Sequence, residues 1–154
     1  MIKVNKKVVD KIEAIKKLSL IKSIDSIKEE ELLSIYKIIP DNTKKHLVNL
    51  INLQKNKLLE GTITFNNNDF QINYETQTAI NNILFLVNQG YKENISWRTA
   101  DNEIIQLTTS EFLNLSKSII LETQNILKKI WEIKDSIESA TSGKEIFTSL
   151  RKLV

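Results

Sequence analysis

Residues 97–112, WRTADNEIIQLTTSEF, predict a tight hairpin that runs directly into a long helix. Apolar and polar residues alternate on both sides of a polar break at residues 100–103, which is typical of two short paired strands. The side chains of Asp101 and Asn102 can bond nearby backbone groups and tolerate left-handed conformations, so the chain is expected to turn there.

A complete helix start follows this hairpin. The hydroxyl of Thr108 is placed as the N-cap, and Glu111, three residues on, can bond back to the Thr108 amide. Leu107 and Phe112 occupy the two positions of a hydrophobic staple. Three independent signals agree on one boundary, so a helix is predicted from residue 109 to about residue 140.

The same stretch carries a family resemblance. WRxxDN at residues 97–102 and LTxxEF at residues 107–112, followed by a long amphipathic helix, resemble a domain of unknown function found in tailed-phage proteins. Such domains often lie in or beside tail and tail-fibre genes. The resemblance extends from about Gly61 to the C-terminus and leaves residues 1–60 uncovered, and it brings no catalytic residues with it.

The chain is expected to have two segments and a mainly helical α+β fold. Residues 1–60 are predicted to form an N-terminal helical segment, with helices over 4–18, 27–39 and from residue 41 to about residue 60. The second helix has Ser26 and Glu29 as a capping box. Three Gly and one Pro in 154 residues favour such long elements.

Residues 61–154 are predicted to form a module of two hairpins and three helices. The first hairpin turns at residues 66–69, a helix follows over about 74–88, and a terminal helix begins after a capping box at Ser142 and Glu145. The two hairpins are expected to share one small antiparallel sheet or to lean on the helices, because an isolated hairpin is marginal in water.

Charge is distributed unevenly along the chain. Residues 1–60 hold 13 basic against 8 acidic residues, a net charge of +5, while residues 61–154 hold 9 against 11, a net charge of −2. A basic N-terminal half allows a nucleic acid as partner. Twenty of the 22 basic residues are Lys, however, and phosphate and base recognition draws on the guanidinium fork. Nucleic-acid binding is therefore the alternative, and solvated helix faces are the preferred interpretation.

The residues that most enzymes use are scarce. There is no Cys and one His, His46, which leaves zinc chemistry without ligands and gives a general base no evident partner. The polar turns at residues 66–69 and 101–103 offer oxygen atoms, but neither has EF-hand spacing. We therefore expect no catalytic residues, no cofactor site, no metal site and no enzymatic activity.

Arg98 stands out in a chain that otherwise uses Lys. Its planar fork beside Trp97 suggests an ion pair with Asp101 or Glu111 that would pin the hairpin to the helix start. The alternative is a contact with a partner protein.

The long helix carries two apolar stripes. The first is expected to face the core and consists of Phe112, Leu115, Ile119, Ile126, Ile130, Ile133 and Ile137. The second lies beside it and consists of Leu113, Ile120, Leu127 and Trp131. Burial within the subunit is one interpretation of Trp131, and an interface anchor is the other. Ile120, Leu127 and Trp131 are thus the candidate partner-binding residues.

The residues alone indicate a soluble globular module, and the resemblance implies a protein that acts by binding other proteins. It implies a phage tail or tail-fibre component, or an assembly chaperone for such a protein, with a tail or fibre protein or copies of itself as partner. No secretory signal or apolar span of about 18 residues is present, so no membrane partner is expected. The expected location is the virion tail, or the host cytoplasm during assembly.

Overall fold

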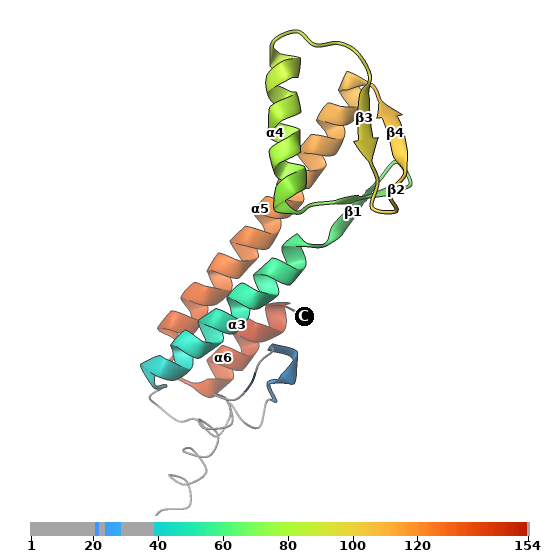
Figure 1. Cartoon of the computed structure of the whole chain (residues 1–154). Coiled ribbons are helices and arrows are strands. Elements are labelled where there is room, and N and C mark those ends of the chain that lie inside the picture. Colours follow the sequence, from blue (N-terminus) through green and yellow to red (C-terminus); the bar gives the residue numbers. More distant parts are fainter. Residues whose placement is uncertain (1–20, 22–23, 29–38, 154) are drawn as a thin grey trace, which may run out of the picture. The chain divides into compact units, whose positions relative to one another are not determined.

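The computed structural model describes residues 21, 24–28 and 39–153 (Figure 1). The helix expected over residues 4–18 lies outside them, as does Glu29 of the first capping box and all but three residues of the helix expected over 27–39. The first described element is the short 3-10 helix η1, Ile24–Ser26.

The chain divides into two compact units that do not follow the order of the sequence. One contains residues 1–55 together with 128–154, and the other contains residues 56–127. The division expected at residue 60 stays a prediction, and this grouping joins residues 128–154 with the segment that contains most of α3. The helix α5, Thr109–Ser139, contributes to both units.

The unit of residues 56–127 contains both hairpins. Strands β1, Thr62–Phe65, and β2, Asn68–Gln71, pair antiparallel, and Asn66 and Asn67 between them have positive φ angles of 48° and 62°. Two successive left-handed residues make a type I′ turn, whose twist matches that of the strands. This explains why the sequence places asparagines there.

The second hairpin is formed by β3, Ile95–Arg98, and β4, Ile104–Leu107. The hairpins form two separate two-stranded sheets, so the expected shared sheet is not formed. One backbone hydrogen bond joins them, from the Ala100 amide to the Asp69 carbonyl, at 2.7 Å. The alternative expectation holds instead, because both hairpins contribute side chains to a core with the helices.

Helix α4, Tyr74–Asn88, and the first half of α5 complete this unit and run side by side (Figure 1). Asn73 caps α4, with its side-chain oxygen accepting from the Thr76 amide at 3.0 Å. The buried core brings together α4, α5 and both hairpins, and comprises Phe70, Ile72, Ile80, Ile95, Trp97, Leu107, Phe112, Leu115 and Ile119.

The other unit is helical in its described part. It contains most of α3, Asp41–Leu59, the second half of α5, helix α6, Gly143–Leu150, and the 3-10 helix η2, Arg151–Leu153. Lys44 Nζ donates to the Glu138 carbonyl at 2.6 Å, which ties the start of α3 to the end of α5. Its buried apolar residues are Ile24, Ile39, Leu47, Leu50, Ile51, Ile130, Ile133, Ile137, Ala140, Ile146, Leu150 and Leu153.

Candidate interaction surfaces

The hairpin and the helix start are joined by a buried aromatic contact. Trp97 on β3 is 9% exposed, and its ring meets that of Phe112 edge-on, with centroids 5.3 Å apart and planes at 61°. Leu107, the other residue of the staple, belongs to the same core. Aromatic pairs in this geometry add roughly 0.5–1.5 kcal/mol beyond their buried area. Trp97 and Phe112 are therefore structural residues of the motif.

The predicted capping box of α5 is confirmed. The Thr108 amide and hydroxyl both donate to Glu111 Oε2, at 2.8 and 2.7 Å, and the Glu111 amide donates to the Thr108 hydroxyl at 3.2 Å. The hydroxyl bond and then the amide bond lower the pKa of Glu111 from its ordinary 4.5, since both stabilise the carboxylate. The negative charge of Glu111 therefore serves to stabilise the start of α5.

The turn between β3 and β4 depends on Thr99, which sequence reasoning did not single out. Thr99 is 6% exposed, and its hydroxyl accepts from the Glu103 amide at 3.1 Å, while its own amide donates to the Glu103 carbonyl at 2.9 Å. Asn102 takes the left-handed conformation, with φ at 65°, as its side chain allows. The sequence offered one signal for this role, namely a Thr hydroxyl four residues before the last residue of the turn.

The expected ion pair of Arg98 is not formed. Arg98 and Asp101 are exposed, and Glu111 is bonded to Thr108 instead. Among the described residues no carboxylate lies within ion-pair distance of the Arg98 guanidinium. Side chains alternate along a strand, so burial of Trp97 turns Arg98 toward solvent. Arg98 was interpreted either as an ion-pair partner within the chain or as a contact with a partner protein, and its exposure is compatible with the second interpretation.

Helix α4 presents an uncharged apolar surface. Phe85 is 63% and Leu86 49% exposed, and Tyr91, just beyond the helix, is 40% exposed. Glu75 is the single charged residue among the 15 of α4, whereas the chain's 27% charged content corresponds to about four in that length. A low content of charged residues, together with exposed aromatic rings, is typical of the centre of protein interfaces. Phe85, Leu86 and Tyr91 form what we call the α4 patch.

The two stripes of α5 have different environments. The first stripe is buried, apart from a half-buried Ile126, as predicted. In the second, Ile120 is 39% exposed, Trp131 is 53% exposed and Leu127 is half-buried. Trp131 is thus not a core residue of the described part, and the interpretation as an interface anchor is the one consistent with its exposure.

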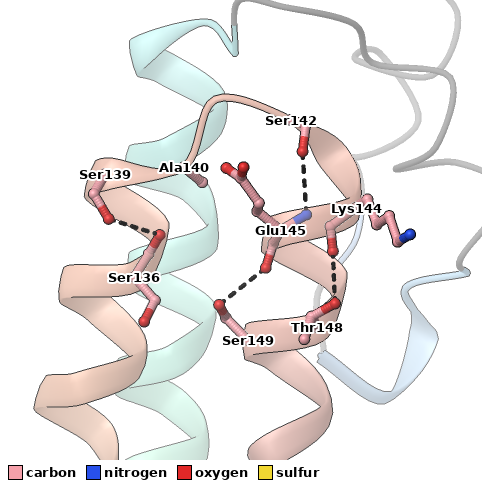
Figure 2. A pocket seen from close by; sticks show the side chains of 8 residues that line it. All are labelled: Ser136, Ser139, Ala140, Ser142, Lys144, Glu145, Thr148 and Ser149. Atoms are coloured by element: carbon pink, nitrogen blue, oxygen red, sulfur yellow. Dashed lines mark hydrogen bonds between the residues drawn. The ribbon is translucent and has the colours of Figure 1, made fainter.

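A shallow pocket of about 460 Å³ lies between the end of α5 and α6 (Figure 2). Ser136, Ser139, Thr148 and Ser149 all donate to the carbonyl four residues earlier, at 2.7–2.9 Å, so their protons are already engaged. Its full lining is Ser136, Ser139, Ala140, Ser142, Lys144, Glu145, Thr148 and Ser149. The lining contains no His that would act as general base for a hydroxyl nucleophile.

Glu145 at the edge of this pocket completes the third predicted capping box in a modified form. The Glu145 amide donates to the Ser142 hydroxyl at 3.3 Å, as expected, but the carboxylate accepts from the Thr141 amide at 2.7 Å, one residue before the cap. The Thr141 amide bond is the main reason why the pKa of Glu145 is lowered. Glu145 therefore supports the helix start.

The single histidine has a structural partner. His46 on α3 is half-buried, and its Nε2 lies 2.8 Å from the carbonyl of Ile21. Because a carbonyl only accepts, Nε2 carries a proton and donates. His46 thus holds residue 21 against α3.

The described residues contain neither a metal-binding cluster nor a helix that could span a membrane. No three His, Cys, Asp or Glu side chains gather there in a metal-binding cluster. None of the described helices combines the length and the apolar character that crossing a membrane requires.

Comparison with known proteins places the chain in a family. Searches among curated proteins and among solved structures give no match. A family model matches residues 43–149, which includes the hairpins, α4, α5 and all but the last residue of α6. The match begins inside α3, earlier than the expected start near Gly61. Because this match covers more than half of the 154 residues, the chain belongs to the family described as Domain of unknown function (DUF4376).

Proposed function

We propose that the protein is a non-enzymatic phage tail-associated protein that binds a tail or tail-fibre protein. Its role is either that of a structural component of the tail or fibre, or that of an assembly chaperone. The phage context is supported by the resemblance of the WRxxDN and LTxxEF motifs, at residues 97–102 and 107–112. The binding role is supported by the apolar surface of the folded module.

The observation that carries the binding role is the α4 patch. Phe85 is 63% exposed although it lies on a helix whose other face, at Ile80, is buried in the core. Exposed apolar side chains that are grouped and uncharged favour a protein partner, whereas singly scattered ones need no explanation. In the complex the partner covers Phe85 and Leu86, and the neutral surroundings keep the cost of desolvation low.

The first experiment separates the two roles. Particles are purified from cells that produce both the phage and this protein, and peptide mass spectrometry gives the copy number per particle. Stoichiometric peptides identify a structural component. Absence from particles, together with a complex with an identified tail or fibre protein in the lysate, identifies an assembly chaperone. Absence from particles and from every complex with a tail or fibre protein overturns the proposal.

A matched pair of variants then tests the α4 patch. Phe85→Asn removes an apolar side chain that is 63% exposed, and Ile104→Asn removes one on β4 that is 64% exposed. Affinity for the identified tail or fibre protein is expected to fall at least tenfold for Phe85→Asn and to stay unchanged for Ile104→Asn. Equal affinities of the two variants would exclude the α4 patch as the binding surface.

A further inference from the structure

The outer face of the β3–β4 hairpin carries a guanidinium group that the fold does not use. Arg98 follows the buried Trp97, and no described residue forms an ion pair, hydrogen bond or ring contact with its side chain. The guanidinium of the other arginine, Arg151, lies 5.3 Å from the centre of the Phe147 ring, a contact that suits its planar group. Twenty of the 22 basic residues are lysines, so an arginine at position 98 indicates a ligand that needs the planar fork.

Two polar side chains share this exposed face with Arg98. Ser96 is two positions earlier on β3, about 7 Å away along the strand, and Gln106 on β4 is the register partner of Ser96. Gln106 Nε2 donates to the Ser96 hydroxyl oxygen at 2.8 Å. The hydroxyl hydrogen of Ser96 and the second hydrogen on Gln106 Nε2 have no acceptor among the described residues. The face therefore offers hydrogen-bond donors beside a positive charge.

We infer that this face binds a carboxylate group, the side chain of an Asp or Glu of the partner protein. The fork of Arg98 donates two parallel hydrogen bonds to the two carboxylate oxygens, a geometry that a lysine ammonium group does not reproduce. The Ser96 hydroxyl and the Gln106 amide donate to the remaining lone pairs of the carboxylate. The inference rests on the proposed function, because the carboxylate belongs to the tail or fibre protein.

The core fixes the strand that carries these donors. Trp97, between Ser96 and Arg98, is 9% exposed, and its ring packs edge-on against that of Phe112. The backbone of β3 is also paired with β4 over its whole length. A strand that is already ordered loses little conformational freedom on binding, so more of the interaction energy appears as affinity.

The charge of the surrounding unit favours a single carboxylate over a polyanion. Residues 56–127 contain 4 basic and 8 acidic residues, a net charge of −4. Two of these acids, Asp101 and Glu103, lie in the turn beside Arg98 without forming an ion pair with it. A nucleic acid needs many basic side chains to neutralise its phosphates, whereas one carboxylate needs one guanidinium. A protein side chain therefore fits this face better than a nucleic acid does.

The affinity of the full chain for the identified tail or fibre protein tests the role of the fork. Arg98→Lys keeps the positive charge and removes the fork, so affinity is expected to fall about fivefold, and Arg98→Gln, which removes both, is expected to lower it about tenfold. Arg151→Lys is the matched control, since it makes the same substitution at the other arginine. Ile104→Asn changes the residue opposite Arg98 and leaves the donors in place. Both controls are expected to keep the native affinity.

A double-mutant cycle identifies the carboxylate. Each exposed Asp and Glu of the partner protein is replaced by Asn or Gln, and each variant is measured against the native chain and against Arg98→Lys. One of these replacements is expected to lower the affinity for the native chain and to have little further effect on Arg98→Lys, because both substitutions remove the same interaction. A purely structural role of Arg98 would not produce this coupling.

The possible outcomes distinguish this inference from the proposed function. Native affinity of Arg98→Lys, in a complex that Phe85→Asn weakens, overturns the inference and leaves the proposed function standing. Additive effects for every carboxylate of the partner overturn it as well, as does a nucleic acid whose binding is lost in Arg98→Lys. Absence of any complex with a tail or fibre protein overturns the proposed function and this inference together.

Discussion

Replacing Thr123 with valine is expected to stabilise the protein, although it removes a polar group from a helix. Thr123 is 6% exposed, and its hydroxyl is buried without a hydrogen bond to any described protein group. Six other helical hydroxyls, Ser118 among them, donate to the carbonyl four residues earlier. In the unfolded chain the Thr123 hydroxyl is hydrated, so folding costs the free energy of removing that water.

The size of the effect follows from the burial. An unsatisfied buried group costs about 1–3 kcal/mol, valine has nearly the same shape, and the two residues have similar helix propensities. The free energy of unfolding is therefore expected to rise by about 1–2 kcal/mol. In a chain of this length each kcal/mol corresponds to roughly 2–4 °C in Tm, so an increase of roughly 2–8 °C is expected.

This change in the free energy of unfolding is measured by thermal and urea unfolding of the native protein and of Thr123→Val, monitored by far-ultraviolet circular dichroism. Thr78→Val provides a control, because the Thr78 hydroxyl is exposed and donates to the Tyr74 carbonyl at 2.9 Å. A lower Tm for Thr123→Val, with an unchanged dependence on urea, would refute the reasoning. It would mean that the Thr123 hydroxyl has a hydrogen-bond partner that contributes more than the methyl group.

Three further predictions concern the hairpins and the start of α5. The pKa of Glu111 is lowered on folding, so its contribution to stability is present above its ordinary pKa of 4.5 and is lost as the pH falls through the lower folded value. Below pH 4.5 the Tm of native protein should therefore fall more steeply than that of Glu111→Gln, and parallel curves would contradict this. Asn67→Val is expected to lose about 1–2 kcal/mol by urea unfolding, because φ at 62° penalises a β-branched side chain, whereas Asn67→Gly should match or exceed native stability. Arg98→Lys should change the free energy of unfolding by less than about 0.5 kcal/mol, since Arg98 is exposed, and a larger loss would show that the guanidinium has a structural partner.

The parts of the fold that the sequence predicted correctly depend on local chemistry. Thr108 and Glu111 are three residues apart, so their capping box needs no distant partner, and it is formed. The bounds of α4 and the turns at Asn67 and Asn102 were likewise predictable, because caps and left-handed residues act within about four positions.

The parts that could not be predicted depend on which distant segments meet. The spacing of Ile120 and Leu127 places them beside the core stripe, but only packing decides whether anything covers them, and Ile120 is left 39% exposed. Conversely, Ser116 is polar but only 1% exposed. The pairing of the hairpins could not be predicted either, since strand patterns do not say which strand edges pair. Only the hydrogen bond from the Ala100 amide to the Asp69 carbonyl joins them, in place of the expected set of hydrogen bonds between paired strands.

The candidate site was predicted in part for the same reason. Trp97 and Phe112 were expected in a structural motif, and their ring contact places them there. The α4 patch went unnoticed because Phe85 and Leu86 continue the apolar run of a helix whose inner face was assigned to the core. The low charge of the whole helix was the signal that could have found it.

The grouping of residues 128–154 with residues 1–55 has a consequence for the order in which the chain acquires its structure. Residues 56–127 form a contiguous unit, so this unit can close before residues 128–154 are synthesised. The apolar face of α3 at Leu47, Leu50 and Ile51 belongs to the other unit, whose residues 128–154 are synthesised after residues 56–127. Until Ile130 and the residues beyond it arrive, this unit lacks part of its buried core, and a chaperone that shields exposed helices would bind the nascent chain there.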